Sequence, residues 1–233
     1  MTSFMVMRRV FIILLGICAV TLAAAQTPSG NPQKFRALIE DVRDLHTKQQ
    51  YAEALKRLEE AETLRQDNAM VNNIRGSIYT MMRDYAKARE SFEASSKLKP
   101  DAYEPRFNLV ELDFVEGKYQ AAEAGFSGLL REFPKLQAGP RQLAQLKIVV
   151  CQLKQDKTEE AAASAKAFAF PDNSPAHYCS QAAFAFQQKD TAAALEWMNK
   201  AGKIFQRGEM VPYVDALVEA KWIQVAASNQ PKK

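Results

Sequence analysis

The sequence predicts an all-α fold built from repeated antiparallel helix pairs, and three regular spacings carry this prediction. An aromatic residue recurs every 34 positions, at Tyr51, Tyr85 and Tyr119. A small residue follows each aromatic residue after three positions, and a large apolar residue follows after four more. The small residues are Ala54, Ala88 and Ala122, and the large ones are Leu58, Phe92 and Phe126. A constant period of about 34 residues with this pattern is typical of helix-turn-helix repeat arrays.

The spacing has a physical basis in the geometry of an α-helix. Ala54, Leu58 and Ala61 lie four and three positions apart, so they share one side of a helix over Tyr51–Arg65. The alanines let neighbouring backbones approach, and the bulky residue fills the gap between pairs. Pro100 ends a unit because proline cannot continue a helix. A single pair cannot bury its own apolar side, so several pairs must stack to form one core.

The stretch from Tyr51 to Pro134 resembles the tetratricopeptide repeat (TPR) family. Residues 69 to 100 match its pattern of Gly, Tyr, aromatic, Ala, Phe and Pro at Gly76, Tyr79, Tyr85, Ala88, Phe92 and Pro100. The next repeat departs from it at Val110 and Asp113. The resemblance implies a right-handed α-solenoid that holds other proteins and catalyses nothing.

The repeat register divides the chain into about five TPR-like units and a capping helix. The expected repeats cover about 35-68, 69-102, 103-136, 142-174 and 175-208, and the capping helix covers 210-227. The last two repeats are degenerate, because Thr158 and Thr191 stand where tyrosine stood before. We expect the sequence LQAGP to be a loop and GEMVP to interrupt the array. Residues 26-34 are expected to be a flexible linker that precedes the TPR-like domain, which covers 35-227. Residues 228-233 are expected to be a disordered tail.

The N-terminus has the pattern of a secretory signal peptide. Arg8 and Arg9 precede an uncharged apolar run, and small residues end at Ala25. This order predicts a signal peptide over 1-25 and an exported protein, periplasmic or secreted from a bacterium. The alternative is a retained inner-membrane anchor, although residues 10–25 are fewer than the roughly 20 apolar residues that span a bilayer.

The charge balance excludes one class of partner. Removal of residues 1-25 lowers the formal charge from +4 to +2. No run of five or more basic residues occurs in the sequence. Nucleic-acid binding therefore has no electrostatic basis here, and no nucleic-acid partner is expected.

The sequence does not assemble a recognisable catalytic set. His46 and His177 lie far apart and have no second ligand at metal-binding spacing, and no glycine-rich phosphate loop occurs. We therefore expect no enzyme activity, no cofactor and no metal. Cys151 and Cys179 fall in the first helices of neighbouring repeats, so either a disulfide or two buried thiols is open. Their offset of about five residues, about 7 Å along a helix, favours the thiols.

The TPR resemblance implies a ligand on the concave face, which the first helix of each repeat lines. By register, the candidate residues are Ile39, Arg43, Met70, Asn73, Met81, Phe107, Glu111 and Phe114. The family's carboxylate clamp is absent, since Ile39, Arg43, Glu104 and Asn108 occupy its places. An apolar middle with methionines suggests an amphipathic helix or an extended apolar peptide as ligand. The alternative is that these residues are core contacts, or are covered by the last helix.

The functional hypothesis is therefore an exported, non-catalytic TPR scaffold or adaptor that binds a protein or peptide in the cell envelope. The alternative is a membrane-tethered TPR assembly factor of an outer-membrane, secretion or pilus machine, for which the N-terminal segment must be retained. Self-association through the last helix, with Trp222 and Ile223, is a further expectation.

Overall fold

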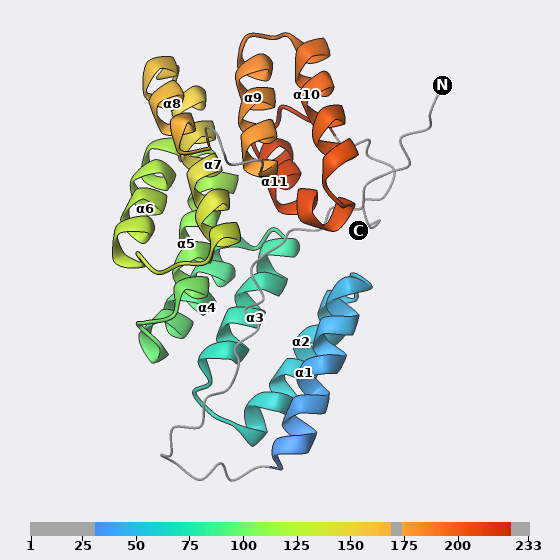
Figure 1. Cartoon of the computed structure of the whole chain (residues 1–233). Helices are drawn as coiled ribbons and strands as arrows, with labels where there is room; N and C mark the ends of the chain where they lie inside the picture. The colour runs from blue at the N-terminus through green and yellow to red at the C-terminus, as the bar shows by residue number, and fades with distance from the viewer. Residues whose placement is uncertain (1–30, 169–173, 225–233) are drawn as a thin grey trace. The chain divides into compact units, whose positions relative to one another are not determined.

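The computed structural model describes residues 31–168 and 174–224 (Figure 1). These residues form eleven α-helices and one short 3-10 helix and include no strand, so the all-α prediction is confirmed. The helices are α1 Pro32–Thr47, α2 Tyr51–Leu64, α3 Ala69–Met81, α4 Tyr85–Leu98, α5 Tyr103–Val115, α6 Tyr119–Glu132, α7 Ala138–Lys154, α8 Thr158–Ala165, α9 Pro175–Gln187, α10 Thr191–Ile204 and α11 Arg207–Glu219, with the 3-10 helix at Lys166–Phe168. The expected signal peptide and C-terminal tail lie outside the described residues.

Successive helices pair as antiparallel neighbours, as in α1 with α2, α3 with α4, α7 with α8 and α9 with α10 (Figure 1). The chain divides into two compact units between Leu112 and Asp113. Residues 31–112 form the N-terminal unit, and residues 113–168 and 174–224 form the described part of the C-terminal unit. Within the described residues, no helix is both long enough and apolar enough to cross a membrane.

The N-terminal unit shows why the repeat pattern has a glycine and a phenylalanine. The ring of Phe92 on α4 is 1% exposed and packs on α3 at Gly76. A Cβ atom at Gly76 would lie 2.5 Å from Cε1 of Phe92, so only glycine leaves room for the ring. In the pair before it, Leu58 is fully buried in a cluster with Val42 and Ile74.

The first helix of each pair ends with the same backbone turn. The residue after the helix cap takes a positive φ at Gln49, Arg83, Gly117, Asp156, Lys189 and Lys221. The next backbone N–H then donates to a carbonyl five residues earlier, for example from Gln50 to Leu45 at 2.9 Å. This is the Schellman arrangement, which satisfies carbonyls at a helix end. Because Lys221 has this conformation, α11 ends as a first helix does.

Two expected loops are helical in the structure. Helix α7 begins at Ala138, so Gly139 and Pro140 of the sequence LQAGP lie in its first turn. Proline is tolerated there because the first N–H groups of a helix have no partner within it. Helix α11 spans Arg207–Glu219 instead of 210-227, and Pro212 lies inside it. The start at Arg207 follows from a capping box, in which the N–H of Gln206 donates to Oε2 of Glu209 at 2.8 Å.

Candidate functional site

Three of the predicted partner-binding residues are core residues. Ile39, Phe107 and Phe114 are 4%, 1% and 0% exposed. The ring centroid of Phe107 lies 5.4 Å from that of Tyr103, and that of Phe114 lies 6.3 Å from that of Phe126. A partner cannot touch these side chains unless the core opens. The prediction of an exposed apolar middle is therefore wrong, because these side chains fill the space between helices.

Three other predicted residues, Met70, Asn73 and Glu111, lie on α3 and α5 in one row with Ser77 and Asn108, which we call the α3–α5 stripe; all of its members except Met70 are buried. It consists of Met70, Asn73 and Ser77 on α3, and Asn108 and Glu111 on α5. The spacings of three and four residues place the members on one side of each helix. Nδ2 of Asn108 donates to Oδ1 of Asn73 at 3.0 Å, so the two helices face each other along this stripe. The predicted residues Asn73 and Glu111 therefore belong to one row of side chains, of which Met70 is the exposed member.

One acceptor in the stripe is not used within the described chain. The Asn108 side chain is 1% exposed, and its Oδ1 atom has no hydrogen-bond partner among the described residues. Leaving a buried acceptor unsatisfied costs about 1–3 kcal/mol. An ordered water would remove this cost. Met70 is 36% exposed at the start of α3, where it offers an adaptable apolar contact.

The stripe also carries one titratable carboxylate and a neighbouring phenol. Glu111 is 7% exposed, and Tyr103 is 7% exposed on the same helix. Burial, followed by the charges of Glu111 and Glu104, raises the pKa of the Tyr103 hydroxyl well above its ordinary value. Tyr103 therefore stays protonated and neutral in the physiological pH range.

Two further predicted residues lie elsewhere on the N-terminal unit. Arg43 is exposed on α1, and Met81 is half-buried as the last residue of α3. A role for either residue in partner binding stays a prediction.

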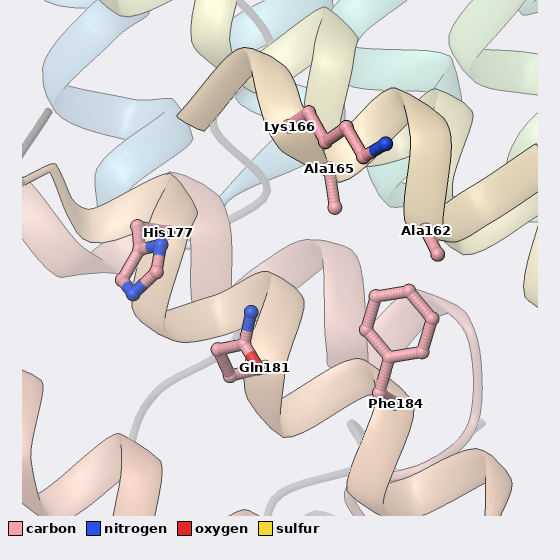
Figure 2. A pocket seen from close by; sticks show the side chains of 6 residues that line it. All are labelled: Ala162, Ala165, Lys166, His177, Gln181 and Phe184. Carbon is pink, nitrogen blue, oxygen red and sulfur yellow. The ribbon is translucent and has the colours of Figure 1, made fainter. Parts of the chain in front are cut away.

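A second candidate site is a cleft in the C-terminal unit, with a volume of about 360 Å³. Its lining residues are Ala162, Ala165 and Lys166 on one side, and His177, Gln181 and Phe184 from α9 on the other (Figure 2). Ala165 lies four residues after Ala161, at the position that Leu58, Phe92 and Phe126 hold in earlier repeats. The large side chain of those repeats is missing here, which leaves room for the cleft.

The cleft has the chemistry of a side-chain pocket. Phe184 and the alanines supply apolar surface, while Lys166 and Gln181 supply polar groups beside it (Figure 2). An apolar side chain followed by a carboxylate fits this lining best. Sequence reasoning missed the cleft, although an alanine at the bulky repeat position was a readable signal.

Both histidines make aromatic contacts. The ring of His177 lies edge-on to Tyr178 and Trp197, at centroid distances of 5.3 and 6.2 Å. The ring of His46 lies 5.9 Å from that of Tyr51, and burial lowers the pKa of His46. Among the residues that the structure describes, no group of three or more His, Cys, Asp or Glu side chains could hold a metal ion.

The two cysteines are buried free thiols, so the disulfide alternative is not realised in the structure. Burial raises the pKa of the Cys179 thiol to about 12. A thiol with so high a pKa is almost entirely protonated near neutral pH and is a poor nucleophile. Cys179 is therefore a buried thiol of low reactivity, as the second alternative predicts.

Comparison with known proteins gives matches in structure alone, since the sequence matches no protein-family model and no curated protein. PilW, a widely conserved type IV pilus biogenesis factor, is 21% identical and superposes with a TM-score of 0.59 over 83% of this chain and 90% of its own. PilF of Pseudomonas aeruginosa is 12% identical and superposes with a TM-score of 0.58 over 82% of this chain and 89% of its own. MamA of Desulfovibrio magneticus RS-1, from its residue 41 onward, is 14% identical and superposes with a TM-score of 0.54 over 73% of this chain and 94% of its own. At these identities the likeness concerns the fold alone, which is a TPR-like right-handed α-solenoid of antiparallel helix pairs.

Proposed function

We propose that the chain is an exported, non-catalytic scaffold that binds a protein or peptide of the cell envelope through the α3–α5 stripe. The observation that carries this proposal is the exposed side chain of Met70 at the start of α3, which continues the row of Asn73 and Ser77. A bound helix or extended peptide presents apolar side chains to such a position. Met70 then packs against an apolar side chain of the same peptide.

Export is part of the proposal and rests on the sequence of residues 1-25. Charged, apolar and small residues follow one another there in the order of a signal peptide. The second candidate function, a membrane-tethered assembly factor, rests on the same segment being retained. PilW, which has a similar fold, is a type IV pilus biogenesis factor. A pilus assembly machine is therefore one that a membrane-tethered factor of this fold would serve.

The intact mass of the protein recovered from cells separates these two candidates. A chain that begins at Gln26 supports the exported scaffold, and its recovery from the periplasm or medium supports the location. A chain that begins before Arg8 and sediments with the membrane supports the tethered factor.

The binding surface is tested with a photo-crosslinking amino acid at Met70. The matched control carries it at Leu98, which is 44% exposed on the second helix α4. We expect discrete adducts from position 70 that position 98 does not give. Equal adducts from both positions would show that the stripe is not the binding surface.

A further inference from the structure

Helix α11 packs in a different way from the other helices of the C-terminal unit. A connection of two residues, Phe205 and Gln206, joins it to α10, yet the two helices make little contact. Helix α11 instead packs on α7 and α9, the first helices of the two preceding pairs. Its terminal turn at Lys221 is that of a first helix, but within the described residues no second helix follows it. It therefore lies as a single helix against a surface that two other pairs provide.

The contact between α11 and this surface is mainly apolar. Leu217, Ala216 and Ala220 are fully buried, and Tyr213 and Val214 are 6% and 7% exposed. The hydroxyl of Tyr213 donates to the backbone oxygen of Gly139 on α7 at 3.4 Å. Leu217 alone, fully buried, gains about 1.5–3 kcal/mol from leaving water. The surface thus selects an amphipathic helix.

The same surface also places a positive charge where no solvent reaches it. Nζ of Lys147 on α7 lies 2.6 Å from Oε2 of Glu219, and the two side chains are 2% and 6% exposed. Nζ of Lys147 also lies 4.3 Å from the centroid of the Phe114 ring. A buried charge without a partner costs several kcal/mol. A helix that brings a carboxylate to Lys147, as α11 does with Glu219, therefore fits this surface better than one that does not.

A third contact follows the end of α11. The ring of Trp222 stacks on Phe186 of α9, with centroids 6.3 Å apart and planes 13° apart. Nζ of Lys154 on α7 lies 4.6 Å from the centroid of the same tryptophan ring. An aromatic residue three positions after the carboxylate is thus a second feature that the surface recognises.

We propose that the surface around Lys147, Lys154 and Phe186 is a binding site for amphipathic helices, with α11 as its resident occupant. A partner helix with a carboxylate in its last turn and an aromatic residue just after it displaces α11. Exchange is feasible because the contacts of α11 are with α7 and α9, so a separate helix can reproduce them. Pro212 removes one backbone hydrogen bond from α11, which weakens the resident helix. This site is distinct from the α3–α5 stripe, so either proposal can fail alone.

The test uses a fluorescein-labelled peptide with the sequence of residues 206–224 and the full chain. Leu217→Asp in the chain puts a charge into the buried side of its own α11 and should free the site. The matched control is Leu195→Asp, at a leucine that is 48% exposed on α10. By fluorescence anisotropy, we expect the Leu217→Asp chain to bind the peptide at least ten-fold more tightly than the control chain does. A peptide with Glu219→Gln should bind at least ten-fold more weakly.

Three results would overturn the proposal. One is a Leu217→Asp chain that keeps the helicity of its other helices yet binds the peptide no better than the control. If Leu217→Asp unfolds the chain, the milder Glu219→Gln chain replaces it and should bind the unmodified peptide several-fold more tightly than wild type does. The second overturning result is that the Glu219→Gln chain and the wild-type chain bind the peptide equally. The third is a wild-type chain that light scattering shows to be a dimer in which the two copies exchange α11. The helix that occupies the site is then that of a second copy and not that of a different partner.

Discussion

Both units of the molecule contain a buried polar contact between helices, and the two contacts compared next differ in kind. In the N-terminal unit, Asn108 donates to Asn73 at 3.0 Å, and both side chains are neutral. In the C-terminal unit, Lys147 pairs with Glu219 at 2.6 Å, and both are charged. A neutral amide pair keeps an acceptor to spare at modest cost, whereas a buried ion pair tolerates the loss of neither member. The first contact joins two helices at modest cost, and the second is suited to specifying which helix may occupy a surface.

The α3–α4 pair and the α7–α8 pair also differ in how the second helix fills the space beside it. The Phe92 ring fills that space completely in the N-terminal unit, against Gly76. Ala165 stands at the equivalent position of the fourth pair, where a cleft of about 360 Å³ lies. Loss of the repeat pattern in the sequence thus corresponds to a local loss of packing, not to a loss of helices.

The largest expected effect is that of Lys147→Ala, which should remove the cation that lies 2.6 Å from the buried Glu219 carboxylate. We expect unfolding free energy to fall by about 3–5 kcal/mol in urea titrations, as for other broken buried ion pairs. The control is Lys48→Ala, which breaks the exposed pair of Lys48 with Asp44 and should cost under about 1 kcal/mol. Combining Lys147→Met with Glu219→Leu should recover most of the loss. Equal costs for the two alanine variants would remove the contrast between the units.

The second effect concerns the close contact in the N-terminal unit. Gly76→Ala should destabilise the chain by about 1–3 kcal/mol, because the added Cβ overlaps the Phe92 ring. Helix propensity alone predicts the opposite sign, with a gain of about 1 kcal/mol for alanine. Gly202→Ala on α10 is the control, since nothing lies within 4 Å of its new Cβ. Thermal unfolding should show this control to be more stable than wild type. A stabilised Gly76→Ala variant would contradict the prediction and would mean that the Phe92 ring moves aside to admit the methyl group.

The sequence was sufficient for the helix pairs because their apolar spacing repeats, even where Thr158 and Thr191 replace tyrosine. It was insufficient for the helix ends. Among the six positive-φ residues that follow the caps of α1, α3, α5, α7, α9 and α11, five are not glycine, so the usual signal for such a turn is missing. The start of α11 was missed because Pro212 resembles a helix breaker, whereas the capping box of Gln206 and Glu209 sets the true start.

The candidate site was predictable only to the level of the helices involved. Register placed Asn73 and Glu111 on first helices correctly, but it also offered Phe107 and Phe114, which are core residues. Burial of a first-helix side chain depends on how closely two helices approach, and periodicity does not give this distance. The contact of Lys147 with Glu219 joins residues 72 positions apart, although a lone lysine inside the apolar run LKIVV was a readable hint.

The smallest expected effect tests whether the cleft is the vacancy of a missing repeat side chain. Ala165→Leu adds three carbons where Leu58, Phe92 and Phe126 stand in earlier repeats, and each buried methylene is worth about 0.8 kcal/mol. Since the cleft is partly open, we expect a gain of about 1 kcal/mol in unfolding free energy, against no gain for the exposed Ala163→Leu on the same helix. A gain confined to position 165 would mean that the fourth pair keeps the register of the first three and has lost only its bulky residue. A loss there would mean that the cleft walls already pack around alanine, so that the two units differ in helix geometry and not only in side-chain size.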